Sequence, residues 1–202
     1  ALIICGTTGE APTLKMEEHL EAIRVAVVRA AGRLPIIAGT GSNDTAYAIS
    51  LTKYACEVGA DAMLLVTPYY NKATQKGLVA SFKAVADAST KPCILYNVPS
   101  RTGCNLLPES VAVLAEHPNI VGIKEACGNI SQVAELCALV ADKIAVYSGN
   151  DDQITPLISL GAKGVISVLS NVAPQLAHDI AQYALDGDFK KSAELQLQYI
   201  DL

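Results

Sequence analysis

Short apolar runs alternate with longer stretches of mixed polarity along the whole chain. Each short run has five or six residues and few polar side chains, which is typical of parallel strands buried on both faces. The pattern predicts seven such strands, at residues 1–5, 35–39, 62–67, 93–97, 120–124, 144–148 and 164–168.

The stretches between these runs predict amphipathic helices. Between residues 14 and 31 the apolar side chains recur at helical spacing, and Gly32 follows the last turn. The same reasoning predicts helices at residues 43–58, 75–88, 110–116, 131–141 and 152–160. Strict alternation of strand and helix indicates a parallel sheet covered by helices.

Two topologies fit this alternation, an open doubly wound sheet and a closed (β/α)8 barrel. Open sheets usually concentrate their chemistry at one glycine-rich loop, and residues 39–44 lack the third glycine of a dinucleotide-binding loop. Here polar residues follow nearly every predicted strand, which is typical of a (β/α)8 barrel, whose active site is built from the loops after its strands. They include Thr7-Thr8, Thr40, Tyr69-Tyr70, Tyr96-Asn97, Lys124-Glu125 and Ser148-Gly149-Asn150. We therefore predict an α/β fold, a (β/α)8 TIM barrel.

Composition restricts the partners and the compartment. The chain has 202 residues, of which 51% are hydrophobic, and a net charge of −5. It is long enough to bury one large core, and it offers no basic cluster to a nucleic acid. No apolar stretch is long enough to span a membrane. The six cysteines lack metal-site or CxxC spacing, so we expect reduced thiols in a cytoplasmic protein and no metal.

Lys124 stands in the otherwise apolar run at residues 120–126. A charged amine is costly in a buried strand. Burial lowers the pKa of a lysine, and the neutral amine can then attack a ketone and form a Schiff base. The ordinary alternative is a lysine that extends from the end of the strand into water.

Other chemically capable residues follow neighbouring strands. Thr7 and Thr8 occupy a glycine-flanked turn, and Arg101 lies in a proline-containing loop after Tyr96. Each has an ordinary structural interpretation, as a turn or a solvated surface side chain. Together they place an amine, carboxylate binders and hydroxyl groups at the ends of different strands. That combination suits carbon–carbon bond formation through an enamine.

Five segments carry a family resemblance. They are GTTGE at 6–10, TPYYN at 67–71, LYNVPSRTG at 95–103, GIKEA at 122–126 and SGNDD at 148–152. In this order and spacing the chain resembles the dihydrodipicolinate synthase family, within the pyruvate-dependent class I aldolases that include N-acetylneuraminate lyase. Thr8, Arg101 and the GIKEA run favour the synthase branch over the lyase branch.

The resemblance implies a catalytic set. Lys124 would form the Schiff base with pyruvate, and Tyr96 would act as general acid and base beside it. Thr8 would link Tyr96 to Tyr70 in a proton relay, with Tyr70 donated across a dimer interface. The implied assembly is a homotetramer built of dimers.

The resemblance also implies the substrates. Thr7 and the backbone of Ile166 would line the pyruvate site, and Arg101 would hold the carboxylate of L-aspartate 4-semialdehyde. Gly149 and Asn150 would lie near that aldehyde. The product would be 4-hydroxy-tetrahydrodipicolinate, on the diaminopimelate route to lysine. No cofactor would be needed, because the lysine itself is the electron sink.

By the same resemblance, this sequence keeps only part of the family's allosteric lysine site. His19, Asn43 and Tyr69 match it, whereas Met16 and Tyr47 stand where feedback-sensitive members carry a second histidine and a glutamate. We therefore expect weak or absent feedback inhibition by lysine.

The resemblance also sets the organisation of the chain. Residues 1–173 would supply strands two to eight of the barrel. Residues 174–202 would supply the last barrel helix and the start of a C-terminal helical region. The first strand–helix unit and the last helices would then be missing. Two other functions stay open, another 2-keto-acid aldolase of the superfamily and a truncated, inactive barrel.

Overall fold

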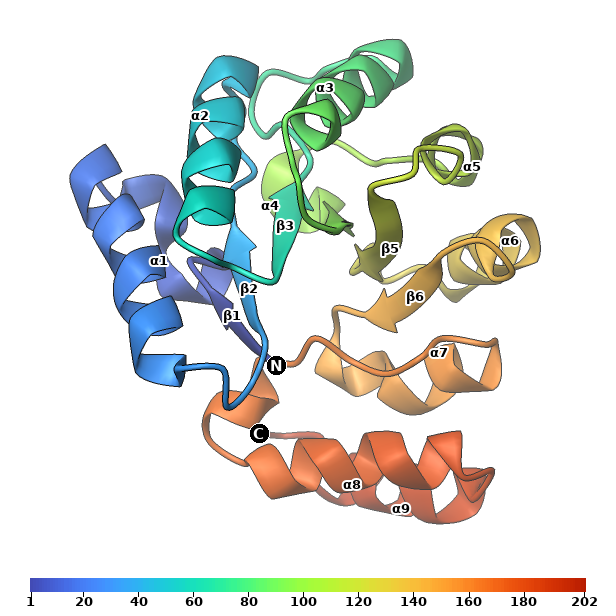
Figure 1. Cartoon of the computed structure of the whole chain (residues 1–202). Coiled ribbons are helices and arrows are strands. Elements are labelled where there is room, and N and C mark those ends of the chain that lie inside the picture. The colour runs from blue at the N-terminus through green and yellow to red at the C-terminus, as the bar shows by residue number, and fades with distance from the viewer.

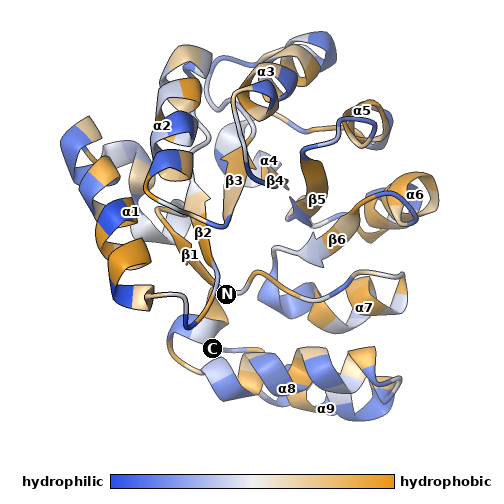
Figure 2. Ribbon diagram, in the orientation of Figure 1, coloured by the Kyte–Doolittle hydropathy of each residue, from blue (hydrophilic) through white to orange (hydrophobic).

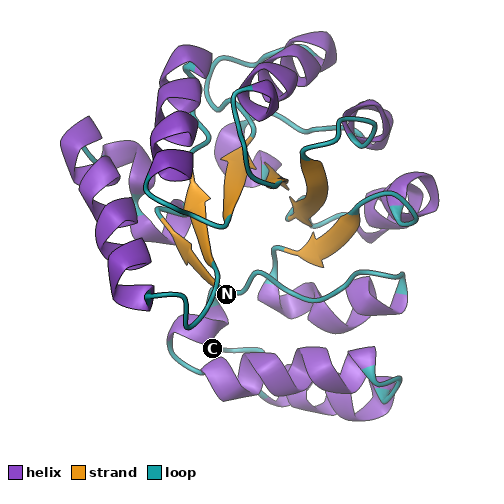
Figure 3. Cartoon of the chain, in the orientation of Figure 1, coloured by secondary structure: helices purple, strands orange, loops and turns teal.

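A computed structural model describes residues 1–202. Its centre is one parallel sheet of six strands in the order β1-β2-β3-β4-β5-β6. The strands are β1 (Leu2–Ile4), β2 (Ile36–Gly39), β3 (Ala62–Val66), β4 (Cys93–Asn97), β5 (Ile120–Glu125) and β6 (Ala145–Ser148). They form a curved arc (Figures 1 and 3). Six of the seven predicted strands are thereby confirmed.

Helices surround this arc on its outer side (Figure 1). They are α1 (Met16–Ala30), α2 (Thr45–Glu57), α3 (Gln75–Asp87), α5 (Pro108–Leu114), α6 (Ile130–Val140), α7 (Ile154–Ser159), α8 (Pro174–Leu185) and α9 (Phe189–Gln198). The short α4 (Pro99–Thr102) instead follows the carboxyl end of β4 and lies inside this ring of helices (Figure 1). The helix starts follow local chemistry. The Asp44 carboxylate accepts hydrogen bonds from the backbone N–H of Ala46 and Tyr47, and Asn129 caps α6 in the same way. Each helix predicted from periodicity is present.

The seventh predicted strand, residues 164–168, is wrong as an element. Only one parallel bridge forms there, between Ser148 and Val165. Gly164 adopts φ of 146°, which breaks the extended run at its first residue, and the chain turns into a 3-10 helix at Leu169–Asn171. The hydrogen bond from Ile166 N to Ser148 O (2.8 Å) still holds the segment beside β6.

Apolar side chains pack on both faces of the sheet. A cluster of 32 buried residues fills the space between the strands and the outer helices. A smaller cluster on the inner face contains Leu64, Ile94, Tyr96, Val98 and Ala126. Figure 2 shows β1, β3 and much of β5 as apolar, β2 and β6 as paler, and most helices as mixed, with apolar and polar sides. This architecture confirms the prediction of an α/β fold of the (β/α)8 barrel type. No helix is long and apolar enough to cross a membrane.

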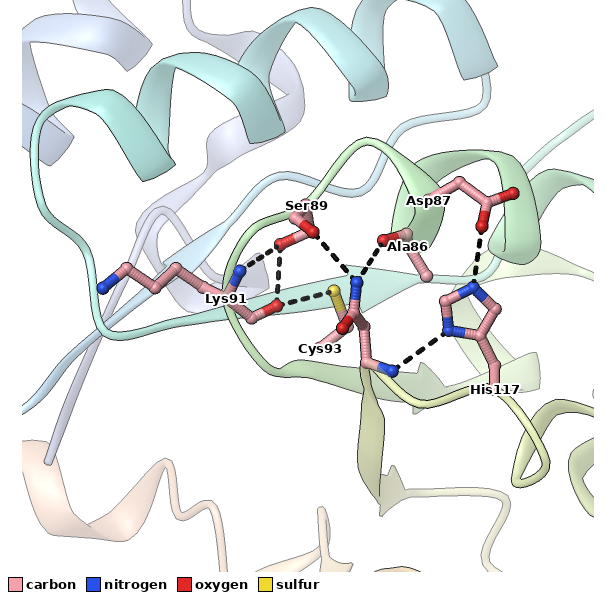
Figure 4. A network of polar contacts seen from close by, with 7 residues as sticks. Ala86, Asp87, Ser89, Lys91, Cys93 and His117 are labelled. Carbon is pink, nitrogen blue, oxygen red and sulfur yellow. Dashed lines mark hydrogen bonds and ion pairs between the residues drawn. The ribbon is translucent and has the colours of Figure 1, made fainter.

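The amino ends of the strands are joined by a network of backbone-directed hydrogen bonds (Figure 4). The side-chain amide of Asn119 donates to the carbonyls of Ala86 (3.0 Å) and Ser89 (2.9 Å). Its backbone carbonyl accepts from Cys93 N at 2.7 Å, and His117 Nδ1 accepts from its N–H at 3.2 Å. Asn119 therefore ties the end of α3 to the start of β4. Polar groups at this face of a barrel serve stability.

Candidate active site

The pairing of β4 with β5 builds the centre of the site. Tyr96 lies opposite Lys124, and Asn97 lies opposite Glu125. Because successive side chains of a strand point to opposite faces, Tyr96 and Lys124 share the inner face of the arc. Asn97 and Glu125 share the face that is covered by helices. One pairing register thus sets two adjacent polar pairs.

The amine of Lys124 is buried against an aromatic ring. The residue is 8% exposed, and Nζ lies 4.4 Å from the centroid of the Tyr96 ring. Burial lowers the pKa of this amine to about 8. The negative charge of Asp151 opposes that shift, and the positive charge of Arg101 adds to it. A large fraction of the amine is therefore neutral at mildly alkaline pH, as a nucleophile requires.

Gly149 makes room for this lysine. A Cβ on Gly149 would lie 2.8 Å from Ala126 Cβ and 3.0 Å from Lys124 Cε. Its N–H donates to the carbonyl of Glu125 at 2.8 Å. Gly149 therefore lets the chain after β6 approach β5 closely enough to enclose the lysine side chain. This packing reason for the glycine is independent of any substrate contact.

The hydroxyl beside Tyr96 belongs to Thr7. Burial raises the pKa of the Tyr96 phenol, while the nearby Thr7 side chain and the charge of Arg101 act in the opposite direction. The sequence comparison assigned this contact to Thr8, but Thr8 lines a different hollow, together with Asp151 and Val168. The turn at Thr7–Gly9 is a 3-10 helix, which rotates neighbouring side chains by about 120°. Thr7 and Thr8 therefore point in different directions.

Two adjoining hollows meet at Thr7. One, of about 310 Å³, is lined by Thr7, Tyr96 and Tyr69 among others. The second, of about 500 Å³, is lined by Thr7, Tyr69, Tyr70 and Arg101. Thr7 therefore borders Tyr96 in the first hollow and Tyr70 and Arg101 in the second.

Tyr70 projects away from its own chain. It is 86% exposed, and its backbone has φ of 73°, a left-handed conformation that is uncommon for a bulky residue. The backbone N–H of Tyr70 donates to the carbonyl of Thr102 at 3.1 Å, which holds the strained turn beside α4. Strain of this kind concentrates at functional sites.

Other predicted site residues lie further along the same face. Ile166 lines a hollow of about 580 Å³ between β1 and α8 and packs on the inner cluster. The Asn150 amide donates to Gln153 at 3.4 Å. Asp151, which belongs to the SGNDD segment that carries the family resemblance, accepts from the backbone N–H of Val168 (2.9 Å) and Leu169 (3.0 Å) through one oxygen. Its other oxygen is buried without a partner.

The predicted allosteric residues are only partly brought together. His19 and Tyr69 line the 310 Å³ hollow beside Met16 and Tyr47. His19 is buried and donates from Nε2 to the Gly39 carbonyl at 2.8 Å, and burial lowers its pKa. Asn43 is absent from this lining.

The lowered pKa of Lys124 predicts selective reactivity towards an amine-specific reagent such as trinitrobenzenesulfonate. The rate of labelling at Lys124 should rise with pH to a midpoint near 8, because only the neutral amine reacts. Lys143 is the matched control, since its ion pair with Glu116 raises its pKa. Peptide mass spectrometry across a pH series measures both rates, and equal midpoints would contradict the prediction.

Comparison with known proteins places this arrangement in a family. The profile of the "Dihydrodipicolinate synthetase family" matches residues 1–202. The 4-hydroxy-tetrahydrodipicolinate synthase of Caldicellulosiruptor bescii is 56% identical over 202 residues, which are 100% of this chain and 68% of that protein. The dihydrodipicolinate synthase structure from Aquifex aeolicus superposes with a TM-score of 0.96 at 46% identity, over 98% of this chain and 68% of that one. The Acinetobacter baumannii synthase, described as chloride inhibited and complexed with pyruvate, has a TM-score of 0.93 at 49% identity, over 96% and 67%. The chain belongs to the dihydrodipicolinate synthase family.

Proposed function

We propose that this protein is a 4-hydroxy-tetrahydrodipicolinate synthase, which condenses pyruvate with L-aspartate 4-semialdehyde. The observation that carries the proposal is the Lys124 amine, which is buried 4.4 Å from the Tyr96 ring centroid and has a pKa lowered to about 8. The relatives that bear this enzyme's name support it, as does the pyruvate bound to one of them.

The chemistry follows from the groups around Lys124. The neutral amine attacks the ketone carbon of pyruvate, and loss of water gives an iminium ion. Loss of a methyl proton gives an enamine, whose carbon attacks the aldehyde of the second substrate. The amino group of that substrate then attacks the imine carbon and releases Lys124. We assign proton transfer at the nitrogen to Tyr96, and the position of its side chain opposite Lys124 on the inner face supports this.

We assign the relay contact to Thr7 and the entrance to Arg101. Two observations support this: Thr7 and Tyr96 line the same hollow, and Thr7 also borders the hollow that contains Tyr70 and Arg101. A guanidinium at that position suits a carboxylate, since it can bind both oxygens. Gly149, Asn150 and the backbone of Ile166 complete the proposed substrate-binding set.

A homo-oligomer is part of the proposal, with dimers assembled into a tetramer. Tyr70 is the supporting observation, because a phenol that is 86% exposed and held in a strained turn is able to enter a neighbouring subunit's site.

The proposed organisation has two parts. Residues 1–173 form the barrel part. Residues 174–202 form the helical part, in which Ser192 Oγ joins α9 to the Ile180 carbonyl of α8 at 2.7 Å.

The proposed reaction uses no metal and no organic cofactor, because the iminium ion on Lys124 withdraws the electrons. The proposed compartment is the cytoplasm. All six cysteines are free thiols, which agrees with a reducing compartment.

The function is tested by trapping the Schiff base. Incubation with pyruvate followed by borohydride should add reduced pyruvate to Lys124, and turnover should follow when aspartate semialdehyde is supplied. Lys124→Ala should lose the adduct, whereas Lys143→Ala should keep it. Mass spectrometry of the peptides measures the adduct. Absence of an adduct would contradict both aldolase functions, and an adduct without turnover would favour another 2-keto-acid aldolase.

The two threonines are separated by matched substitutions. Thr7→Val removes the hydroxyl beside Tyr96, so kcat at saturating pyruvate should fall by about tenfold or more, within the range of proton-transfer catalysis. Thr8→Val should lower kcat less, because Thr8 faces another hollow. Steady-state kinetics of both variants decide the matter. An equal or larger loss for Thr8→Val would restore the original assignment.

We also propose that feedback inhibition of the protein by L-lysine is weak or absent. The hollow at His19 offers Met16 and Tyr47, neither of which supplies a carboxylate for the amine of lysine. Half-inhibition is expected above about 1 mM, which corresponds to a weak complex. Tyr47→Glu should lower that concentration. A lysine titration of the rate measures both, and inhibition of the unsubstituted protein at micromolar lysine would refute the proposal.

A further inference from the structure

Glu125 is a buried acid that no step of the proposed reaction uses. It follows Lys124 directly on β5, is 2% exposed, and faces the outer helices rather than the inner hollow. An isolated buried carboxylate is costly, so such a group is normally held by several hydrogen bonds. Burial raises the pKa of Glu125, and its hydrogen bonds with Asn97 and Cys127 oppose that rise.

The bonds of Glu125 reach the neighbouring strand. The side-chain amide of Asn97 donates to both carboxylate oxygens, at 3.0 and 3.2 Å. The backbone N–H of Cys127 donates to Oε1 at 2.8 Å, which fixes the start of the following loop. The backbone adds a third link, since Ala126 N donates to the Asn97 carbonyl at 2.9 Å. The carboxyl ends of β4 and β5 are thus bound together by side chains as well as by the sheet.

Asn97 is itself held from the outside. It is fully buried, and its Oδ1 accepts from Leu106 N at 2.9 Å. Its amide also donates to Asn105 Oδ1 at 2.9 Å. Asn105 in turn exchanges two hydrogen bonds with Gln132 of α6, at 2.8 and 3.2 Å. The orientation of the Asn97 amide is therefore fixed before it meets Glu125.

The hydrogen bonds between Asn97 and Glu125 can hold the pairing register of β4 and β5, which is irregular further back along the strands. The pairing is irregular between Cys93 and Ile94, because Cys93 pairs with Ile120 and Ile94 pairs with Gly122. Tyr96 lies opposite Lys124 only beyond that irregularity. A slip of one residue would turn every side chain of the strand to the other face. A pair that is complementary only in the observed register therefore protects the approach of Tyr96 to Lys124.

We propose that Glu125 is a positioning residue, which acts through Asn97 to hold Tyr96 opposite Lys124. This inference rests on the proposed function. With an amide at position 97 the role requires a carboxylate at position 125, because both oxygens accept hydrogen bonds from that amide and Oε1 also accepts from Cys127 N–H. A glutamine would present its own N–H groups to donors.

Three variants of the whole protein test the pair. Glu125→Gln removes one acceptor, and Asn97→Asp sets two acids against each other. Each should lower kcat by roughly ten- to a hundredfold, as small misplacements of reacting groups do, with KM for pyruvate nearly unchanged. The double variant exchanges acid and amide between the strands and restores one complementary pair. Its kcat should recover to within roughly fivefold of the unsubstituted protein, since contacting residues are not additive.

Asn119→Asp is the matched control. It disturbs an amide of the same kind at the amino ends of the strands, where Asn119 holds the Ala86 and Ser89 carbonyls. This variant should lower the melting temperature and leave kcat unchanged. If Glu125→Gln does not fold, Asn105→Ala decides the question, because it removes an outer contact of Asn97 and leaves Glu125 in place. It should lower kcat in the same direction with KM unchanged.

The outcomes separate the inference from the proposed function. Adduct formation with pyruvate by the unsubstituted protein is measured first, and its absence would count against the function rather than against Glu125. With an active protein, an unchanged kcat in Glu125→Gln, or in Asn105→Ala where that variant is needed, would overturn the positioning role. A folded double variant without recovery would overturn it too.

Discussion

The site depends on one pairing register, that of β4 with β5. Tyr96 and Lys124 meet because their Cα positions are directly opposed in a parallel pair, and the pleat then sends both side chains to the inner face. The same opposition sends Asn97 and Glu125 to the helix-covered face. Reactive and supporting groups therefore alternate along the same two strands, and a change in register would displace all four together.

The burial of Lys124 follows from that geometry. The amine cannot leave the strand end for water, since Gly149 lets the neighbouring chain close over its methylene groups. A pKa lowered from 10.5 to about 8 corresponds to a net cost of roughly 3 kcal/mol for the charged form at this site, with burial as the main cause. The negative charge of Asp151 limits the shift. The fold thus holds the lysine near the boundary between its two protonation states.

The sequence was sufficient for the elements and less so for the fine contacts. Periodicity located β5 and the lysine in it, because an amine in an apolar run is visible without coordinates. It also predicted a strand at residues 164–168, where the glycine conformation that breaks the strand cannot be read from hydropathy. The choice between Thr7 and Thr8 depends on the rotation of a 3-10 turn. Two identical adjacent residues carry no sequence signal for that choice.

Asn97 and Asn119 show how position decides the meaning of one chemistry. Both side-chain amides donate hydrogen bonds at an end of the β4–β5 pair, Asn97 at the carboxyl end and Asn119 at the amino end. Asn119 donates only to backbone carbonyls, so its bonds stabilise the amino ends whatever reaction takes place at the other end of the barrel. Asn97 donates to a carboxylate one residue beyond Lys124, so its bonds also determine where the reacting nitrogen lies. In a parallel barrel, the distance along the strand from the carboxyl end separates a stabilising hydrogen bond from one that supports chemistry.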